Sequence, residues 1–108
     1  MEYNVIFLHQ AELDLKELKK YIASDFSEAT WQTSYMNIKR TVNALALFPE
    51  AGSIPPELDV LNLIQYRQVI SGKNRIIYEV KGTSVFIHIV CDTRRDMVSL
   101  LMKRLLRI

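Results

Sequence analysis

The stretch IQYRQVISGKNRIIYEVKGTSVFIHIVCD, residues 64–92, decides the fold. It contains three segments rich in Ile, Val, Tyr and Phe, at residues 64–71, 74–81 and 84–92. Residues of these types favour β-strands. The segments are separated by Ser-Gly-Lys and Lys-Gly-Thr, whose glycines suit tight hairpin turns. The stretch therefore predicts a three-stranded antiparallel meander.

Two amphipathic helices precede this meander, because apolar residues return every three or four positions. The first helix starts near Gln10 and ends near Asp25, and its apolar face consists of Ala11, Leu15, Leu18 and Ile22. The second has Ser27 or Asp25 as its N-cap and stops at Pro49. Its apolar face consists of Trp31, Tyr35, Ile38, Val42 and Leu45. Only a few residues join the two helices, which predicts an antiparallel helical hairpin.

A short strand, a loop and a terminal helix complete the prediction. Residues 3–8 form a β-favouring run, and residues 51–61, with Gly52 and Pro55-Pro56, suit an extended loop. Thr93, followed three residues later by Asp96, resembles a helix-capping signal. The apolar face of the terminal helix consists of Met97, Leu100, Leu101 and Leu105. The order strand, helix, helix, three strands, helix predicts one α+β domain over residues 1–108.

Length and charge limit the kinds of function. A chain of 108 residues buries a thin core without room for an internal cofactor, so we expect no cofactor and a function on the surface. Residues 1–59 contain five Lys or Arg and nine Asp or Glu, which gives a charge of −4. Residues 60–108 contain nine Lys or Arg and three Asp or Glu, which gives a charge of +6. This asymmetry has two explanations: an anionic partner for the second half, or mutual neutralisation of the halves in the fold.

Cysteine usage and the absence of targeting signals indicate the cellular compartment. Cys91 is the one cysteine, so no disulfide forms within the chain, and no Cys/His cluster has metal-ligand spacing. The apolar run at residues 5–8 is too short for a signal peptide or a membrane span. We therefore expect a cytoplasmic protein with no metal and no membrane contact. Signatures of nucleotide-binding and metallohydrolase proteins are also absent.

The basic residues are the candidate functional groups. If Gly72-Lys73 is a two-residue turn, Arg67 and Arg75 point to opposite faces of the sheet, whereas another register places them together. Arg94 and Arg95 either bind phosphate or carboxylate, or pair with a neighbouring aspartate. The terminal cations, which complement a helix dipole without any partner, are Lys103, Arg104 and Arg107. His88 lies in mid-strand, where it serves either packing or acid-base chemistry.

Several motifs together resemble the RelE/ParE superfamily of small bacterial toxins from type II toxin-antitoxin modules. The resemblance covers essentially the whole chain. It is carried by Ala11–Leu18, Phe48-Pro49-x-x-Gly52, Tyr66-Arg67, Arg75-Ile76-Ile77-Tyr78-Glu79-Val80 and Asp92-x-Arg94-Arg95-Asp96. Within the superfamily the chain looks most like ParE, and we consider the branch whose antitoxin is a short PaaA-type peptide. The resemblance implies a toxin, of the kind linked to plasmid stabilisation, that a cognate antitoxin holds in a hetero-oligomeric complex.

The two branches of the superfamily imply different activities. RelE-like members cut mRNA in the ribosome with basic residues, whereas ParE-like members are described as DNA gyrase inhibitors without a hydrolytic site. Val69 and Leu100 stand where the RNA-cutting pattern has a lysine and a tyrosine, which favours gyrase inhibition without catalysis. The alternative is a ribosome-dependent endoribonuclease. Its candidate catalytic residues are Arg67, Arg75, Arg94, Arg95, Tyr78 and His88.

The resemblance also suggests which surfaces meet partners. The candidate contacts with the target, gyrase or the ribosome and its mRNA, are Arg94, Arg95, Lys103, Arg104 and Arg107. The candidate contacts with the antitoxin are Trp31, Tyr35, Leu101 and Leu105, of which Trp31 equally suits the internal core. Antitoxins of this kind are commonly acidic or amphipathic and fold on their partner.

Overall fold

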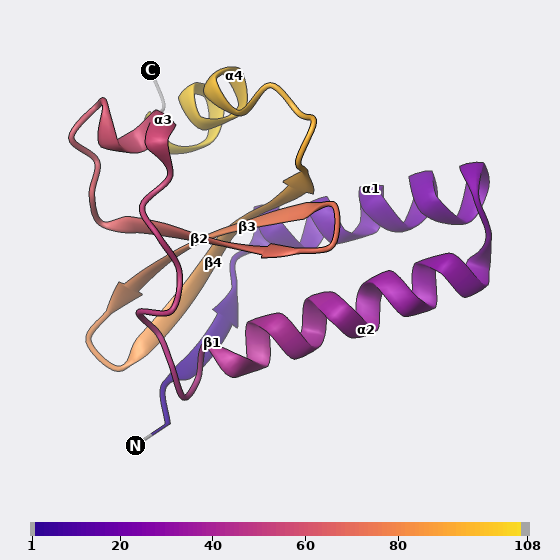
Figure 1. Cartoon of the computed structure of the whole chain (residues 1–108), viewed down its shortest axis with the longest axis horizontal. Helices are drawn as coiled ribbons and strands as arrows, with labels where there is room; N and C mark the ends of the chain where they lie inside the picture. The colour runs from indigo at the N-terminus through magenta and orange to yellow at the C-terminus, as the bar shows by residue number, and fades with distance from the viewer. Residues whose placement is uncertain (1, 107–108) are drawn as a thin grey trace.

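A computed structural model describes residues 2–106 of the chain. A helical hairpin and a short C-terminal helix flank a four-stranded sheet (Figure 1). The elements are β1 (Asn4–Phe7), α1 (His9–Asp25), α2 (Glu28–Ala44), α3 (Pro56–Asp59), β2 (Tyr66–Ser71), β3 (Asn74–Lys81), β4 (Ser84–Asp92), α4 (Met97–Leu101) and the π-helical turn η1 (Met102–Leu106). The predicted α+β order is confirmed.

The sheet has the strand order β1-β4-β3-β2. Strands β2, β3 and β4 form the predicted antiparallel meander, and β1 lies parallel to β4, with Asn4 opposite Ser84 and Phe7 opposite Ile87. A parallel pair needs a long crossover connection. The helical hairpin begins that connection, which places the N-terminal strand beside the last strand of the meander.

The first hairpin turn settles the register that the sequence leaves open. Ser71 lies opposite Asn74, so the turn has two residues, and Gly72 has a φ of 59°. A glycine with positive φ at the first central position is typical of a type II′ turn. In this register Arg67 and Arg75 point to opposite faces of the sheet.

A bulge interrupts the pairing of β3 with β4. Ile77 lies opposite Ile89 and Tyr78 lies opposite Ile87, so His88 is the extra residue on β4. A bulge re-aims the side chains around it. His88 and Ile89 therefore share one face, and the His88 ring contacts Glu79 and Tyr66 there.

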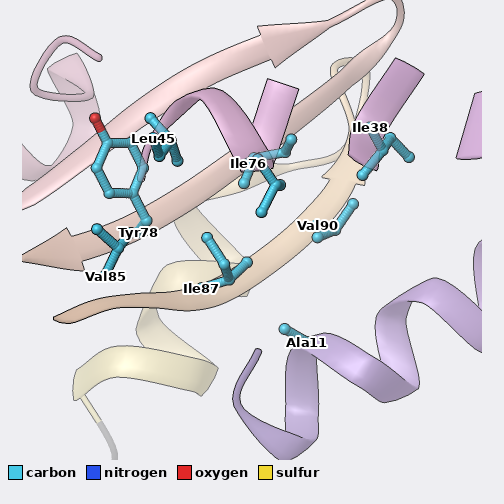
Figure 2. Close-up of a cluster of buried hydrophobic side chains, with 9 residues drawn as sticks. Ala11, Ile38, Leu45, Ile76, Tyr78, Val85, Ile87 and Val90 are labelled. Carbon is cyan, nitrogen blue, oxygen red and sulfur yellow. The ribbon is translucent and has the colours of Figure 1, made fainter. Parts of the chain in front are cut away.

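The main core lies between the sheet and the helical hairpin (Figure 2). Its buried members are Ala11, Ile38, Val42, Leu45, Ile76, Tyr78, Val85, Ile87 and Val90. The helical members carry the three- and four-residue spacing of the sequence, and the strand members alternate along β3. Ile38, Val42 and Leu45 of the predicted apolar face are thus confirmed as core residues, whereas Trp31 is buried outside this cluster and Tyr35 is half-buried.

A second core lies on the opposite face of the sheet, under α3 and α4. Its buried members are Leu58, Ile77, Ile89, Cys91, Met97, Leu100 and Leu101. Because β3 contributes to both cores, it is buried along most of its length, consistent with a central strand. The short helices close this second layer.

Local details correct several boundaries. Ser27 is the N-cap of α2, since its side chain accepts a hydrogen bond from the Thr30 amide. The expected extended loop contains the helix α3, because Pro56 occupies its first turn, where proline is tolerated. The cap of α4 is Asp96, which accepts from the Ser99 amide, so the capping pattern that begins at Thr93 was wrong by three residues.

Candidate functional site

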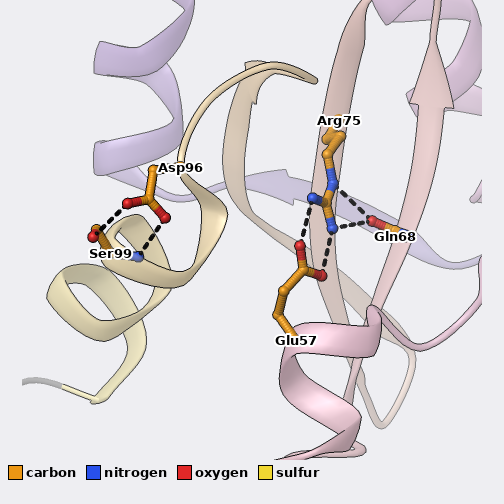
Figure 3. A network of polar contacts seen from close by, with 5 residues as sticks. All are labelled: Glu57, Gln68, Arg75, Asp96 and Ser99. Atoms are coloured by element: carbon orange, nitrogen blue, oxygen red, sulfur yellow. Dashed lines mark hydrogen bonds and ion pairs between the residues drawn. The ribbon is translucent and has the colours of Figure 1, made fainter.

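Arg75 holds the short helix α3 against the sheet (Figure 3). Its guanidinium donates to both carboxylate oxygens of Glu57 at 3.0 Å, and also to Oε1 of Gln68. Only 12% of the Arg75 side chain is exposed. The hydrogen bond from Arg75 lowers the pKa of Glu57. The donors of this arginine are therefore directed into the protein.

Tyr78 and Arg67 fasten the segment that follows α2. The Tyr78 hydroxyl donates to the Pro49 carbonyl at 2.8 Å and accepts from the Gly52 amide at 2.9 Å. Burial raises the pKa of Tyr78. Arg67 donates to the Gly52 carbonyl at 2.8 Å. A Cβ at Gly52 would collide with the Gln68 carbonyl, so the Phe-Pro-x-x-Gly motif is a packing motif in this chain.

Arg94 lies at the end of β4, on the surface. Its amide and its guanidinium donate to the Asp92 carboxylate at distances of 2.8–3.1 Å, and 72% of its side chain is exposed. These hydrogen bonds lower the pKa of Asp92. Arg95 is also exposed, beside Glu17 and Cys91. This corner therefore presents two neighbouring guanidinium groups to solvent.

Cys91, below that corner, is a core residue. It is 5% exposed, and burial raises the pKa of its thiol to about 11. Nucleophilic cysteines depend on a lowered pKa and an accessible thiolate. Cys91 has neither property, so this site offers no thiol chemistry at neutral pH.

Arg104 ties the C-terminal segment to α1 and β4. It donates to both carboxylate oxygens of Asp14, at 2.9 and 3.1 Å, and to the His88 carbonyl at 2.7 Å. Asp14 also accepts from the Val90 amide at 3.0 Å. The pair thus binds the Val90 amide and the His88 carbonyl, which lie on the edge of β4 beyond the part that is paired with β1. We call Asp14 and Arg104 the edge clasp.

The remaining C-terminal candidates divide between surface and core. Lys103 is exposed, whereas Leu101 is 2% exposed and belongs to the second core. Arg107 and the side chain of Leu105 lie outside the described residues.

The two aromatic candidates on α2 stack on each other. The Trp31 and Tyr35 rings have centroids 5.4 Å apart. Trp31 is 5% exposed and Tyr35 is half-buried. Of this pair, Tyr35 has the larger share of its surface open to a partner.

Sequence reasoning missed a carboxylate–imidazole pair. Nε2 of His88 lies 3.1 Å from Oε1 of Glu79, and the ring of Tyr66 meets the imidazole edge-on at 5.2 Å between centroids. Burial and the charge of Glu79 raise the pKa of Tyr66. The three side chains lie on one face of the sheet, since Tyr66 and Phe86 lie opposite Glu79 and His88 follows Phe86 by two residues. Because the contact depends on the register between β3 and β4, no local signal in the sequence marks the pair.

The structure distributes the six candidate catalytic residues over both faces of the sheet. Arg67 and Tyr78 bind the segment after α2, Arg75 binds α3, and Arg94 and Arg95 lie at the far end of β4. His88 joins Glu79, which was not a candidate. Across residues 2–106, no three His, Cys, Asp or Glu side chains are arranged to hold a metal ion.

Two solved structures share this fold. One, described as the chromosomal ParDE toxin-antitoxin system from P. aeruginosa, is 14% identical, with a TM-score of 0.70 over 84% of this chain and 96% of that one. The other, a double arginine-to-alanine mutant of E. coli toxin RelE in the free state, is 19% identical, with a TM-score of 0.65 over 97% of this chain and 99% of that one. The fold is thus that of the small toxins of type II toxin-antitoxin modules.

The family follows from the sequence match. The model of the ParE toxin of the type II toxin-antitoxin system, parDE, matches residues 5–97, and the chain belongs to this family. This confirms the family that the motifs predicted. No curated protein matches the chain. None of the helices in the described part of the chain has the length and hydropathy needed to cross a bilayer.

Proposed function

We propose that this ParE-family toxin inhibits DNA gyrase by binding it, without hydrolytic chemistry, in the bacterial cytoplasm. The observation that carries the proposal is the engagement of Arg67, Arg75 and Tyr78 in internal hydrogen bonds. A nuclease needs such groups free to meet phosphate or to move a proton. Here their hydrogen-bonding atoms hold the loop after α2 and the helix α3.

The proposed contact surface for gyrase is the cationic corner of Arg94 and Arg95, together with Lys103 on η1. These three side chains are exposed. Exposed cations favour encounter with an anionic surface and are frequent anchors of interfaces when they are arginine. Arg104 contributes differently, because its guanidinium belongs to the edge clasp. Arg107 remains a proposed contact on the sequence alone.

We further propose that a cognate antitoxin neutralises the toxin, as the description of the ParDE relative suggests. The half-buried Tyr35, which stacks on the buried Trp31, is the aromatic candidate for that contact. The PaaA-type peptide is the form of antitoxin that we propose from the sequence motifs. Co-expression with the adjacent small open reading frame should restore growth and yield a stable complex; toxicity that persists without a complex contradicts this part of the proposal.

The gyrase proposal is tested by supercoiling and DNA-cleavage assays with purified toxin. We expect inhibition of supercoiling or trapping of cleaved DNA, and a loss of about tenfold in potency when Arg94 and Arg95 are both changed to alanine. The matched control changes Lys39 and Arg40 to alanine, which removes the same charge from α2 and should leave potency unchanged. Toxin that affects neither supercoiling nor cleavage at any concentration refutes the proposal.

One observation favours the alternative, a ribosome-dependent endoribonuclease. His88 and Glu79 form an imidazole–carboxylate pair with Nε2 and Oε1 3.1 Å apart, and such pairs serve as acid and base in phosphoryl transfer. Primer extension on translated mRNA tests this activity. Cuts within codons that depend on induction, and that disappear in Glu79→Gln but persist in Glu12→Gln, which changes an exposed carboxylate of α1, would establish it. A message that stays intact removes it.

A further inference from the structure

A cavity of about 330 Å³ lies between the helical hairpin and the turn that joins β2 to β3. Its walls come from α1, α2, the turn and the end of β4 (Figure 1 shows these elements). Its volume lies within the range of small-molecule sites, about 300–1,000 Å³. None of the residues discussed above as nuclease candidates lines it, except Arg94 at the rim.

Two polar residues of low exposure, Ser71 and Asn74, lie at the base of the cavity. Ser71 and Asn74 are 6% and 7% exposed, lie opposite each other across the turn, and share the face of the sheet that carries Ile76. Within residues 2–106 neither side chain forms a hydrogen bond. Every polar side-chain atom there that is fully sealed from solvent has a partner, so the atoms of Ser71 and Asn74 are not fully sealed. Their hydrogen-bonding atoms are therefore open to the cavity. Water satisfies these atoms in the empty cavity, so a ligand that displaces the water must offer hydrogen bonds in its place.

The remaining walls are aromatic on one side and polar on the other. Tyr21 and Phe26 meet edge-to-face with centroids 6.1 Å apart, and they are 41% and 63% exposed. Thr30, Ser34 and Asn37, spaced four and three residues apart on α2, supply hydroxyl and amide groups. The cavity thus combines aromatic ring faces with several neutral hydrogen-bonding groups.

Two cations stand at the rim. Lys73 is exposed on the turn, and Arg94 is exposed and oriented by Asp92. An oriented guanidinium beside an ammonium group suits a phosphate. The carboxylate of Asp92 lines the cavity as well, so the three charged groups leave a net charge of +1 at the rim, which favours one anionic group. The interior suits a flat, neutral, polar ring.

We propose that this cavity binds one nucleotide, with the base against Tyr21 and Phe26 and the phosphate at Lys73 and Arg94. The edge of the base supplies partners for Ser71 and Asn74. An apolar peptide side chain would leave both groups unpaired, at a cost in affinity, and a bare phosphate would not use the aromatic wall. The nucleotide comes from one of two sources, a free mononucleotide or an unpaired position in a DNA strand. This inference stands independently of the gyrase target.

The test is a titration of the purified, isotope-labelled toxin followed by amide chemical shifts. The probes are the four deoxynucleoside 5′-monophosphates, a short single-stranded DNA and inorganic phosphate. We expect saturable shifts at Gly72, Lys73 and Ser34 and none at Gly82, the turn glycine between β3 and β4. Tighter binding of the strand than of every mononucleotide assigns the strand as the source, and equal or weaker binding assigns the free nucleotide.

Variants distinguish base recognition from charge. Tyr21→Ala should weaken binding about 5- to 150-fold, the range for the loss of one base–aromatic stack, whereas Tyr35→Ala should have no effect. Lys73→Gln should weaken binding, and Lys81→Gln, which removes the same charge at the other turn, should not. Ser34→Phe fills the cavity and should abolish the shifts, which keeps the test decisive if an Asn74 variant fails to fold.

Three results overturn the proposal. The first is the absence of saturable shifts around the cavity with any nucleotide. The second is equal binding of inorganic phosphate, or equal losses in Lys73→Gln and Lys81→Gln, since both indicate unspecific attraction of anions. The third is a set of cavity shifts produced by an acidic antitoxin-derived peptide and by no nucleotide, which would make the cavity a peptide-docking site.

Discussion

Replacement of Asp14 by alanine tests whether the edge clasp stabilises the fold. Asp14→Ala removes the acceptor of two hydrogen bonds from Arg104 and one from the Val90 amide. The side chains of Asp14 and Arg104 are 15% and 14% exposed. The variant therefore leaves the Val90 amide without its acceptor and the largely buried Arg104 guanidinium without a carboxylate, with only the His88 carbonyl still accepting from it.

The expected loss follows from this burial. Removal of one partner of a fully buried ion pair costs about 3–5 kcal/mol, and the residual exposure of both side chains lets water compensate in part. We expect a decrease of about 3 kcal/mol in the free energy of unfolding. For a domain of this length each kcal/mol lowers Tm by about 4 °C, so Tm should fall by about 12 °C.

Urea unfolding followed by circular dichroism measures the change, and Glu17→Ala, at an exposed position of the same helix, is the matched control. Asp14→Leu combined with Arg104→Met should destabilise less than the sum of the single changes, because the double variant leaves no unpaired charge. A free energy of unfolding for Asp14→Ala that lies within about 0.5 kcal/mol of the control's would refute the reasoning, as would strict additivity.

Three further outcomes are expected. Gly52→Ala should destabilise the fold by about 2 kcal/mol, because the added Cβ would collide with the backbone carbonyl of Gln68. An unchanged Tm in calorimetry would contradict the packing role of Gly52. Arg75 lowers the pKa of Glu57 on folding, so the carboxylate stabilises the fold above the ordinary carboxyl pKa of 4.5, and this contribution is lost as pH falls through the lower folded value. Over that acidic range the urea midpoint of Glu57→Gln should fall less than that of the unchanged protein. Parallel curves for the two proteins would exclude the linkage. Asp96→Ala should cost about 1 kcal/mol through loss of the helix cap and Thr93→Ala much less, and equal losses in urea unfolding would argue against the observed cap.

The sequence predicts the helices and the meander because those signals are local. The spacing from Trp31 to Leu45 marks a core face of α2, and the glycines at 72 and 82 mark the two turns. The register remains open in the sequence because composition allows more than one turn length. The observed pairing of Ser71 with Asn74 fixes it and separates Arg67 from Arg75.

The contacts of the candidate residues depend on long-range geometry that no local pattern encodes. Glu57 reaches Arg75 only because α3 forms inside a segment whose prolines suggested an extended loop. His88 reaches Glu79 across the β3–β4 pairing, two positions beyond Phe86, which lies opposite Glu79. The alternative that one arginine pairs with a nearby aspartate is visible in the sequence, and Arg94 does so with Asp92.

The parallel pairing of β1 with β4 affects how the protein assembles. Asn4 meets Ser84 across the sheet, so the first strand pairs only after nearly the whole chain is available. Contacts of such high sequence separation raise contact order and slow folding, whereas the helical hairpin forms from neighbouring residues. A chain shortened before β4 would leave β1 without its neighbour in the sheet. The completed sheet, and any toxicity that depends on it, is therefore a property of the finished chain.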